Sequence, residues 1–142
     1  MPRDHLIRRG RTALIVDDDL GVRLIVARML EGEAYAVRIA PSAAIALLIL
    51  AAEPGTIDLA LIDVRMPGMN GLDLALELQR CWPDLPVGLM SAHEPEEMAS
   101  THQSLAALPF LVKPFTAQAL LSLLETLAAQ AGPAPADAVG PA

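Results

Sequence analysis

Residues 57–71 have the sequence IDLALIDVRMPGMNG. The segment Leu59–Ile62 is a continuous apolar run, which is typical of a strand covered by helices on both faces of a sheet. The strand predicted over Ile57–Asp63 therefore ends in a carboxylate. Met66–Gly71 then supplies proline, glycine and asparagine, the residues that favour turns. This stretch predicts a buried strand, a polar strand end and a turn that leads into a helix.

The same strand-and-helix unit recurs along the chain. Strands are predicted over Thr12–Asp17, Ala34–Ala40, Ile57–Asp63, Pro86–Ser91 and Leu108–Val112. Helices are predicted over Leu20–Glu31, Ser42–Glu53, Gly71–Trp82, Glu94–Ser104 and Thr116–Gln130. Strict alternation of five such βα units predicts an α/β fold with a parallel sheet.

The second predicted strand differs from the other four because its pattern alternates. Tyr35, Val37 and Ile39 fall on one side, and Ala36 and Arg38 fall on the other. A strand at the edge of a sheet tolerates this pattern, whereas a central strand covered on both faces is usually apolar throughout. A second strand at the edge fits the flavodoxin-like, doubly wound order 2-1-3-4-5.

Two helices carry clear signals of how they pack. Asp19 stands where an N-cap of the first helix is expected. Val22, Ile25, Val26 and Met29 follow at the spacing of a buried helix face. The last helix is predicted to bury four leucines, Leu120, Leu123, Leu124 and Leu127.

Composition limits the kinds of function that the chain can have. Its 142 residues suit one domain. A net charge of -7, with 3% aromatic residues and no basic run after residue 11, makes nucleic-acid binding improbable and favours protein partners. The longest apolar run, Ala43–Ala52, is shorter than the roughly 18–20 residues of a membrane span. With no secretory segment and the single cysteine Cys81, a cytoplasmic location is expected.

The chain divides into three parts by composition. Residues 1–10 form a basic N-terminal extension, residues 11–130 hold the βα units, and residues 131–142 (AGPAPADAVGPA) are an aperiodic tail that we expect to be disordered. No linker to an output domain is apparent after residue 130. A domain that stands alone and acts by docking is therefore expected.

Polar residues that a core cannot explain fall at the carboxyl ends of the predicted strands. The first strand ends at Asp17 and Asp18, the third at Asp63, the fourth at Ser91 and the fifth at Lys113. In an open parallel sheet, ligands bind at this edge. In the order 2-1-3-4-5 these four strands are neighbours, so the five side chains are expected to converge on one cleft.

The residue types in this cleft favour phosphoryl transfer. Three neighbouring carboxylates would repel one another, and a divalent cation relieves that repulsion. Oxygen ligands suit Mg²⁺, which commonly binds carboxylates together with a phosphate. Lys113 and Ser91 offer a positive charge and a hydroxyl donor to phosphoryl oxygens. The constellation therefore predicts transfer of a phosphoryl group onto a carboxylate.

Four segments resemble the receiver domains of two-component response regulators, and the resemblance covers about residues 11–130. They are Leu14-Ile15-Val16-Asp17-Asp18-Asp19, Leu61-Ile62-Asp63-Val64-Arg65-Met66-Pro67-Gly68-Met69-Asn70-Gly71, Met90-Ser91-Ala92 and Phe110-Leu111-Val112-Lys113-Pro114-Phe115. Any one of them would be a weak signal, whereas all four in order and at similar spacing are a strong one.

The resemblance implies roles for the cleft residues. Asp63 would accept the phosphoryl group from a histidine kinase or a histidine phosphotransfer protein. Asp17, Asp18, Asp63 and the backbone carbonyl of Arg65 would hold Mg²⁺ or Mn²⁺. Lys113 would pair with the phosphate. The protein would be a phosphoacceptor switch, with at most self-catalysed phosphoryl transfer and autodephosphorylation, and would not be an enzyme acting on other substrates.

The resemblance also implies how the signal leaves the site. Ser91 would follow the phosphoryl group inward, and Phe110 would change its packing. The bond between Lys113 and Pro114 would be cis. The surface around the fourth helix, fifth strand and fifth helix would then bind a target protein or a second copy of the chain. The uncharged second helix is a further candidate for a partner surface.

Departures from the family pattern and rival functions bear on this interpretation. Ser91 replaces the commoner threonine and keeps the hydroxyl, while Phe110 has no phenolic hydroxyl. A phosphohydrolase of the haloacid dehalogenase type would need an acid where Arg65 stands. A flavodoxin-like cofactor protein would need a phosphate loop where Asp17 and Asp18 stand. The remaining alternative is a receiver-like binding module that signals without phosphorylation.

Overall fold

The computed structural model describes residues 10–66, 68–92, 105 and 107–131. The predicted extension, the predicted tail beyond Ala131 and the predicted helix Glu94–Ser104 lie outside these residues, so they stay predictions. Among the described residues, no helix is long and apolar enough to cross a membrane.

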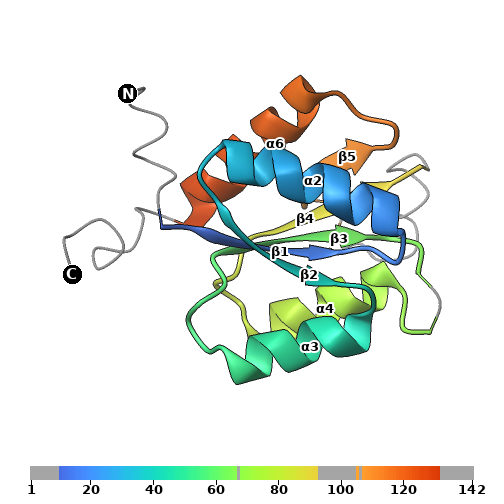
Figure 1. Ribbon diagram of the computed structural model, residues 1–142. Helices are drawn as coiled ribbons and strands as arrows, with labels where there is room; N and C mark the ends of the chain where they lie inside the picture. Colours follow the sequence, from blue (N-terminus) through green and yellow to red (C-terminus); the bar gives the residue numbers. More distant parts are fainter. Residues whose placement is uncertain (1–9, 67, 93–104, 106, 132–142) are drawn as a thin grey trace.

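Five parallel strands form one sheet in the order β2-β1-β3-β4-β5, which confirms the predicted flavodoxin-like topology (Figure 1). The strands are β1 Thr12–Val16, β2 Ala36–Ala40, β3 Leu59–Asp63, β4 Val87–Ser91 and β5 Phe110–Val112. The three central strands, β1, β3 and β4, are buried along their whole length. Strands β2 and β5 form the two edges.

Helices cover both faces of the sheet. They are α2 Leu20–Gly32, α3 Ala43–Ala52, α4 Gly71–Cys81 and α6 Ala117–Ala131. Figure 1 shows α2 and α6 on one face and α3 and α4 on the other. Alternate residues of each strand therefore enter two separate cores: Leu14 packs with the α3 and α4 residues, whereas Ile15 packs with those of α2 and α6. The four leucines predicted to be buried on the last helix are buried.

Capping residues explain where three helices begin. The side chains of Asp19, Ser42 and Asn70 accept hydrogen bonds from the backbone N–H groups of the first turns of α2, α3 and α4. Each satisfies an N–H that has no partner within its helix. The predicted cap at Asp19 is confirmed. Two of these helices, α2 and α4, are the elements that follow β1 and β3, whose ends carry the predicted cleft.

The sequence prediction is wrong about Ile25 and about where three strands start, since β3 starts at Leu59 instead of Ile57 and β5 at Phe110 instead of Leu108. Ile25 was placed on the buried face of α2, but 56% of its surface is exposed, and the buried residues are Val26, Ala27 and Leu30. The second strand was started at Ala34, which instead has a φ of 69°. The following Tyr35 donates its N–H to the carbonyl of Leu30. The end of α2 thus continues through a left-handed turn, and the strand starts at Ala36.

Candidate functional site

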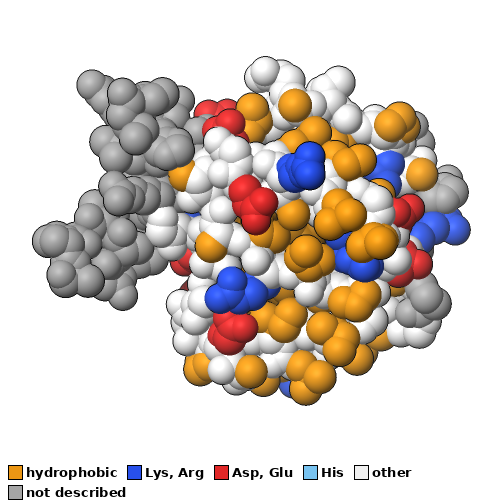
Figure 2. All heavy atoms as spheres, viewed as in Figure 1, with side chains coloured by type: hydrophobic (Ala, Val, Ile, Leu, Met, Phe, Trp, Pro, Cys, Tyr) orange, Lys and Arg blue, Asp and Glu red, His pale blue; other side chains and the backbone are white. Residues whose placement is uncertain are grey.

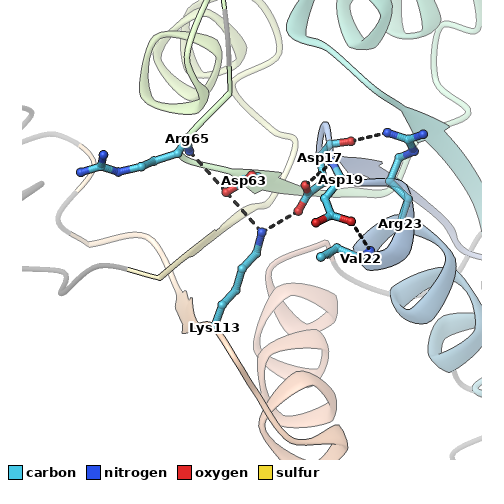
Figure 3. A network of polar contacts seen from close by, with 7 residues as sticks. All are labelled: Asp17, Asp19, Val22, Arg23, Asp63, Arg65 and Lys113. Atoms are coloured by element: carbon cyan, nitrogen blue, oxygen red, sulfur yellow. Dashed lines mark hydrogen bonds and ion pairs between the residues drawn. The ribbon is translucent and has the colours of Figure 1, made fainter.

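The predicted cleft residues lie together at the carboxyl edge of the sheet. Asp17 follows β1, Asp63 is the last residue of β3, Ser91 is the last of β4, and Lys113 follows β5. Because the strands are parallel and adjacent, their ends bring together side chains that are up to 96 positions apart in sequence. Figure 3 shows Asp17, Asp63 and Lys113 pointing toward one another from three strands.

An acidic cluster forms the centre of the site. Carboxylate oxygens of Asp17, Asp18 and Asp63 all lie within 4.8 Å of one another. Asp17 is completely buried and Asp63 is 5% exposed, whereas Asp18 is exposed to solvent. Two buried carboxylates at this distance repel each other in a medium that screens charge poorly. The cluster therefore needs positive charge close by.

Lys113 supplies part of that charge. Its Nζ lies 2.8 Å from Oδ2 of Asp17 and 3.5 Å from Oδ1 of Asp63 (Figure 3). Burial lowers the pKa of Lys113, but the hydrogen bond to Asp17 and the charges of Asp63 and Asp17 outweigh burial and leave this pKa above its ordinary value. The amine is thus fully protonated at neutral pH. One lysine cannot balance the charge of three carboxylates, so the cluster can also bind a cation.

Asp63 binds a proton more tightly than an ordinary surface aspartate does. Burial, followed by repulsion from Asp17, raises its pKa from 3.8 to about 6, although Lys113 and the N–H of Arg65 act in the opposite direction. Ionised Asp63 therefore lowers the stability of the folded protein. Binding of a cation beside it, or removal of its charge, would relieve that cost.

We expect the Asp63→Asn variant to be more stable than the wild-type protein at pH 7.5 in a chelating buffer, by about 1–3 kcal/mol. The folded protein binds a proton at Asp63 more tightly than the unfolded chain, so its stability falls as pH rises between 3.8 and about 6. The variant lacks this dependence. Urea unfolding from about pH 4 to pH 7.5 should show two curves that converge at the acidic end. A wild-type curve parallel to that of the variant would contradict the raised pKa.

The turn after β1 is held by contacts that the sequence pattern did not predict. Arg23, on α2, donates from its guanidinium to the backbone carbonyl of Asp17 at 2.8 Å. The N–H of Asp19 donates to Oδ1 of Asp17 at 2.9 Å. These bonds fix both the main chain and the side chain of Asp17 (Figure 3). The one feature of the sequence that could have indicated them is Arg23, a single charged residue in the otherwise apolar start of α2.

The turn after β3 depends on a glycine. A Cβ atom at Gly71 would lie 2.0 Å from the carbonyl oxygen of Asp63 and 2.7 Å from Cα of Val64. Both are backbone atoms that cannot move without displacing the strand end. The N–H of Gly71 also donates to the carbonyl of Val64 at 2.9 Å. The start of α4 is therefore packed directly against the backbone that carries Asp63, a role that the sequence indicated only as turn chemistry.

Ser91 and Phe110 flank the site from the strands on its other side. Ser91 is buried, and its carbonyl accepts a hydrogen bond from the N–H of Lys113 at 2.8 Å. Phe110 is partly buried and packs against the core on the α3 and α4 face. The peptide bond between Lys113 and Pro114 is cis. Arg65 is exposed, and its N–H donates to Oδ1 of Asp63 at 3.3 Å.

Comparison with known protein families identifies the family of the chain. Residues 13–125 match the response regulator receiver domain. The chain belongs to this family. Receiver domains act as signalling switches in two-component systems, and the predicted fold class and family are therefore confirmed.

Relatives and solved structures agree with this assignment. The transcriptional regulatory protein GlrR of Escherichia coli is 36% identical over 123 residues, which are 85% of this chain and 27% of GlrR. The response regulator TrrA of Thermotoga maritima, solved in complex with Mg²⁺ and BeF, has a TM-score of 0.73 and 29% identity, covering 82% of this chain and 98% of TrrA. The receiver domain of NtrX from Brucella abortus has a TM-score of 0.74 and 31% identity, with the same coverage. The chain spans about a quarter to a third of the length of the curated relatives it matches.

Proposed function

We propose that this receiver domain, over residues 11–130, is switched by phosphorylation of Asp63. The observation that carries the proposal is the placement of Asp63, which is buried between a second carboxylate and a lysine at the end of a central strand. A carboxylate with a raised pKa is a better nucleophile than an ordinary one at the same degree of ionisation. Lys113, together with a cation held by the carboxylates, would neutralise the charge of an incoming phosphoryl group.

A divalent cation, Mg²⁺ or Mn²⁺, fits this donor set. Asp17, Asp18 and Asp63 supply carboxylate oxygens, and Arg65 would add its backbone carbonyl. These are all hard oxygen donors, which suits Mg²⁺. When bound, the cation would neutralise charge on the carboxylates and on the phosphoryl oxygens. A solved relative, TrrA, holds Mg²⁺ together with BeF.

The chain's own residues perform the transfer. The donor is a phosphohistidine of a histidine kinase or a histidine phosphotransfer protein. A carboxylate oxygen of Asp63 forms a bond to phosphorus while the bond from phosphorus to the donor nitrogen breaks. Lys113, which already lies 3.5 Å from Asp63, moves from Asp17 toward a phosphoryl oxygen. The hydroxyl of Ser91 donates to another of these oxygens.

Output follows from movement of Ser91 and Phe110. Ser91 moves toward the new phosphoryl group, and Phe110 repacks against the space that Ser91 leaves. Ser91 ends β4, which pairs with β5, and Phe110 is the first residue of β5. The surface of β5 and the α6 helix that follows it, together with the fourth helix predicted over Glu94–Ser104, would therefore bind a target protein or a second copy. The acidic charge of the chain disfavours nucleic acid as a direct partner. A cytoplasmic setting fits these partners.

Beryllofluoride, a mimic of a phosphoryl group bound to a carboxylate, tests the proposal. We expect ¹⁹F NMR to show a bound beryllofluoride signal with the wild-type protein and Mg²⁺. The signal should vanish on addition of EDTA and should be absent in Asp63→Asn. The rival function, a receiver-like module that signals without phosphorylation, predicts no Asp63-dependent signal. Asp73→Asn, an exposed acid on α4, is the matched control and should bind like the wild type.

A further inference from the structure

Strand β2 presents an open edge of the sheet. Among the described residues it pairs only with β1. The N–H of Ala36 donates to Arg11 of the chain entering β1, and the carbonyl of Ala40 accepts from Asp17. Backbone groups of successive strand residues point in opposite directions. The N–H and C=O groups of Val37 and Ile39 therefore point away from β1, toward the open edge.

The side chains beside these backbone groups are apolar. Val37 packs against the core on the α2 face, so Ile39, two residues on, lies on the same face and is 39% exposed. Leu20 and Leu24 are exposed on α2. Figure 2, which views the molecule from this side, shows hydrophobic side chains gathered over α2, β2 and α3. The open backbone edge is thus framed by apolar surface.

The part of the chain that the structure describes gives β2 little of the usual protection of an edge strand. Edge strands are commonly kept apart by outward-facing charges, prolines or bulges. The one charged residue of β2 is Arg38, which lies on the opposite face of the strand from Ile39. Its Nε is bound at 3.0 Å to a carboxylate oxygen of Glu53 at the end of α3. This charge is held within its own chain and leaves the edge open.

We propose that two copies of the chain pair antiparallel along β2, with a two-fold axis at Arg38. Val37 of each copy then lies opposite Ile39 of the other, and each such pair exchanges backbone N–H···O bonds in both directions. Val37 and Ile39 of both copies form one cluster of β-branched side chains on the α2 face. On the α3 face the two Arg38 side chains meet, each neutralised by Glu53. The sheet continues across both copies.

Neighbouring registers are weaker, which makes this pairing specific. A shift by one pair toward the end of the strand places Pro41 opposite Val37, and proline has no N–H to donate. A shift the other way uses Tyr35, whose N–H is already bonded to the carbonyl of Leu30. The interface is isologous, as in most homodimers. It is separated from Asp63 by β1, so this association is independent of phosphorylation.

Sedimentation equilibrium of the full chain in EDTA tests the proposal, because neither cation nor phosphoryl group is then involved. The wild-type protein is expected to dimerise reversibly. Ile39→Pro removes the outward N–H and the isoleucine side chain while leaving the bonds to β1 in place, and Ile39→Lys places charge in the apolar cluster. Each should weaken association at least about tenfold, roughly 1.4 kcal/mol. Ile25→Lys is the matched control, since Ile25 is exposed on α2 beside Pro114 and Phe115.

Thermal unfolding at low concentration should show that the Ile39 variants remain folded. A wild-type protein that stays monomeric at all soluble concentrations would overturn the proposal. A dimer that both Ile39 variants leave unweakened would overturn it as well, because then another surface carries the association.

A disulfide tests the register. Arg38 lies on the proposed axis as a non-hydrogen-bonded pair with a Cα separation of about 4.5 Å, within the range of a disulfide. In a Cys81→Ser background, Arg38→Cys is expected to oxidise to a covalent dimer much faster than Met69→Cys, an exposed position in the turn after β3. Equal rates for the two variants would exclude this pairing.

Discussion

The Gly71→Ala variant is expected to lose about 3 kcal/mol of stability and most of its affinity for beryllofluoride. The added methyl group would lie 2.0 Å from the carbonyl oxygen of Asp63, far closer than non-bonded carbon and oxygen atoms can approach. All three neighbours nearest to that methyl group are backbone atoms of Asp63 and Val64. The start of α4 must therefore move away from β3, and the strand end that carries Asp63 must shift with it.

Urea unfolding and ¹⁹F NMR measure the two effects in the same samples. Gly32→Ala is the matched control, since Gly32 ends α2 and a Cβ there would meet nothing within 4 Å. It should unfold like the wild type and bind beryllofluoride normally. If Gly71→Ala also kept wild-type stability and binding, the close contact between α4 and the Asp63 backbone would have no functional importance.

Asp17→Asn is expected to weaken Mg²⁺ binding by about 10–100-fold or more. Asp17 is the most buried member of the acidic cluster, and its carboxylate also holds Lys113 at 2.8 Å. Asparagine keeps the shape but removes the charge that both the cation and the lysine require. Lys113 would then bind more closely to Asp63, and this would further disfavour the cation. Isothermal titration calorimetry with Mg²⁺ measures the change.

Asp19→Asn removes the same charge from a neighbouring position and serves as the control. The Asp19 side chain accepts a hydrogen bond from the N–H of Val22, and asparagine caps helices equally well. Its Mg²⁺ affinity should change far less than that of Asp17→Asn. Equal weakening in the two variants would mean that overall negative charge, and not coordination by Asp17, determines cation binding.

The topology and the contents of the cleft could be predicted from the sequence because both follow from simple periodicities. Continuous apolar runs identify strands covered on both faces, and the alternation in Val37, Arg38 and Ile39 identifies an edge strand. Once the strand order is known, residues at strand ends must be neighbours. Asp17, Asp63 and Lys113 could therefore be brought together although they lie far apart in sequence.

Contacts that depend on helix orientation could not be predicted in the same way. The helical spacing of Val22, Ile25, Val26 and Met29 fits a buried face, but a rotation of a fraction of a turn decides whether Ile25 is inside. The structure places it outside, beside Pro114 and Phe115. The bond from Arg23 to the Asp17 carbonyl depends on the same rotation.

Side-chain partners in a charged cluster are also undetermined by sequence. The resemblance indicated that Lys113 would meet a phosphate, and the structure shows where its amine lies before any phosphate is present. It lies between Asp17 and Asp63, 2.8 Å and 3.5 Å from their carboxylate oxygens. The close packing of Gly71 against Asp63 could not be predicted either, because the same turn sequence is compatible with several backbone conformations.

Intact-mass spectrometry after incubation with acetyl phosphate and Mg²⁺ tests the central claim most directly. The wild-type protein should gain the mass of one phosphoryl group, which should be lost in alkali, as expected of an acyl phosphate, and should not form in EDTA. Asp63→Asn should gain nothing under the same conditions. A wild-type protein that forms no adduct with acetyl phosphate or with a phosphorylated histidine kinase, or an adduct of equal yield in Asp63→Asn, would contradict the assignment of Asp63 as the phosphoacceptor.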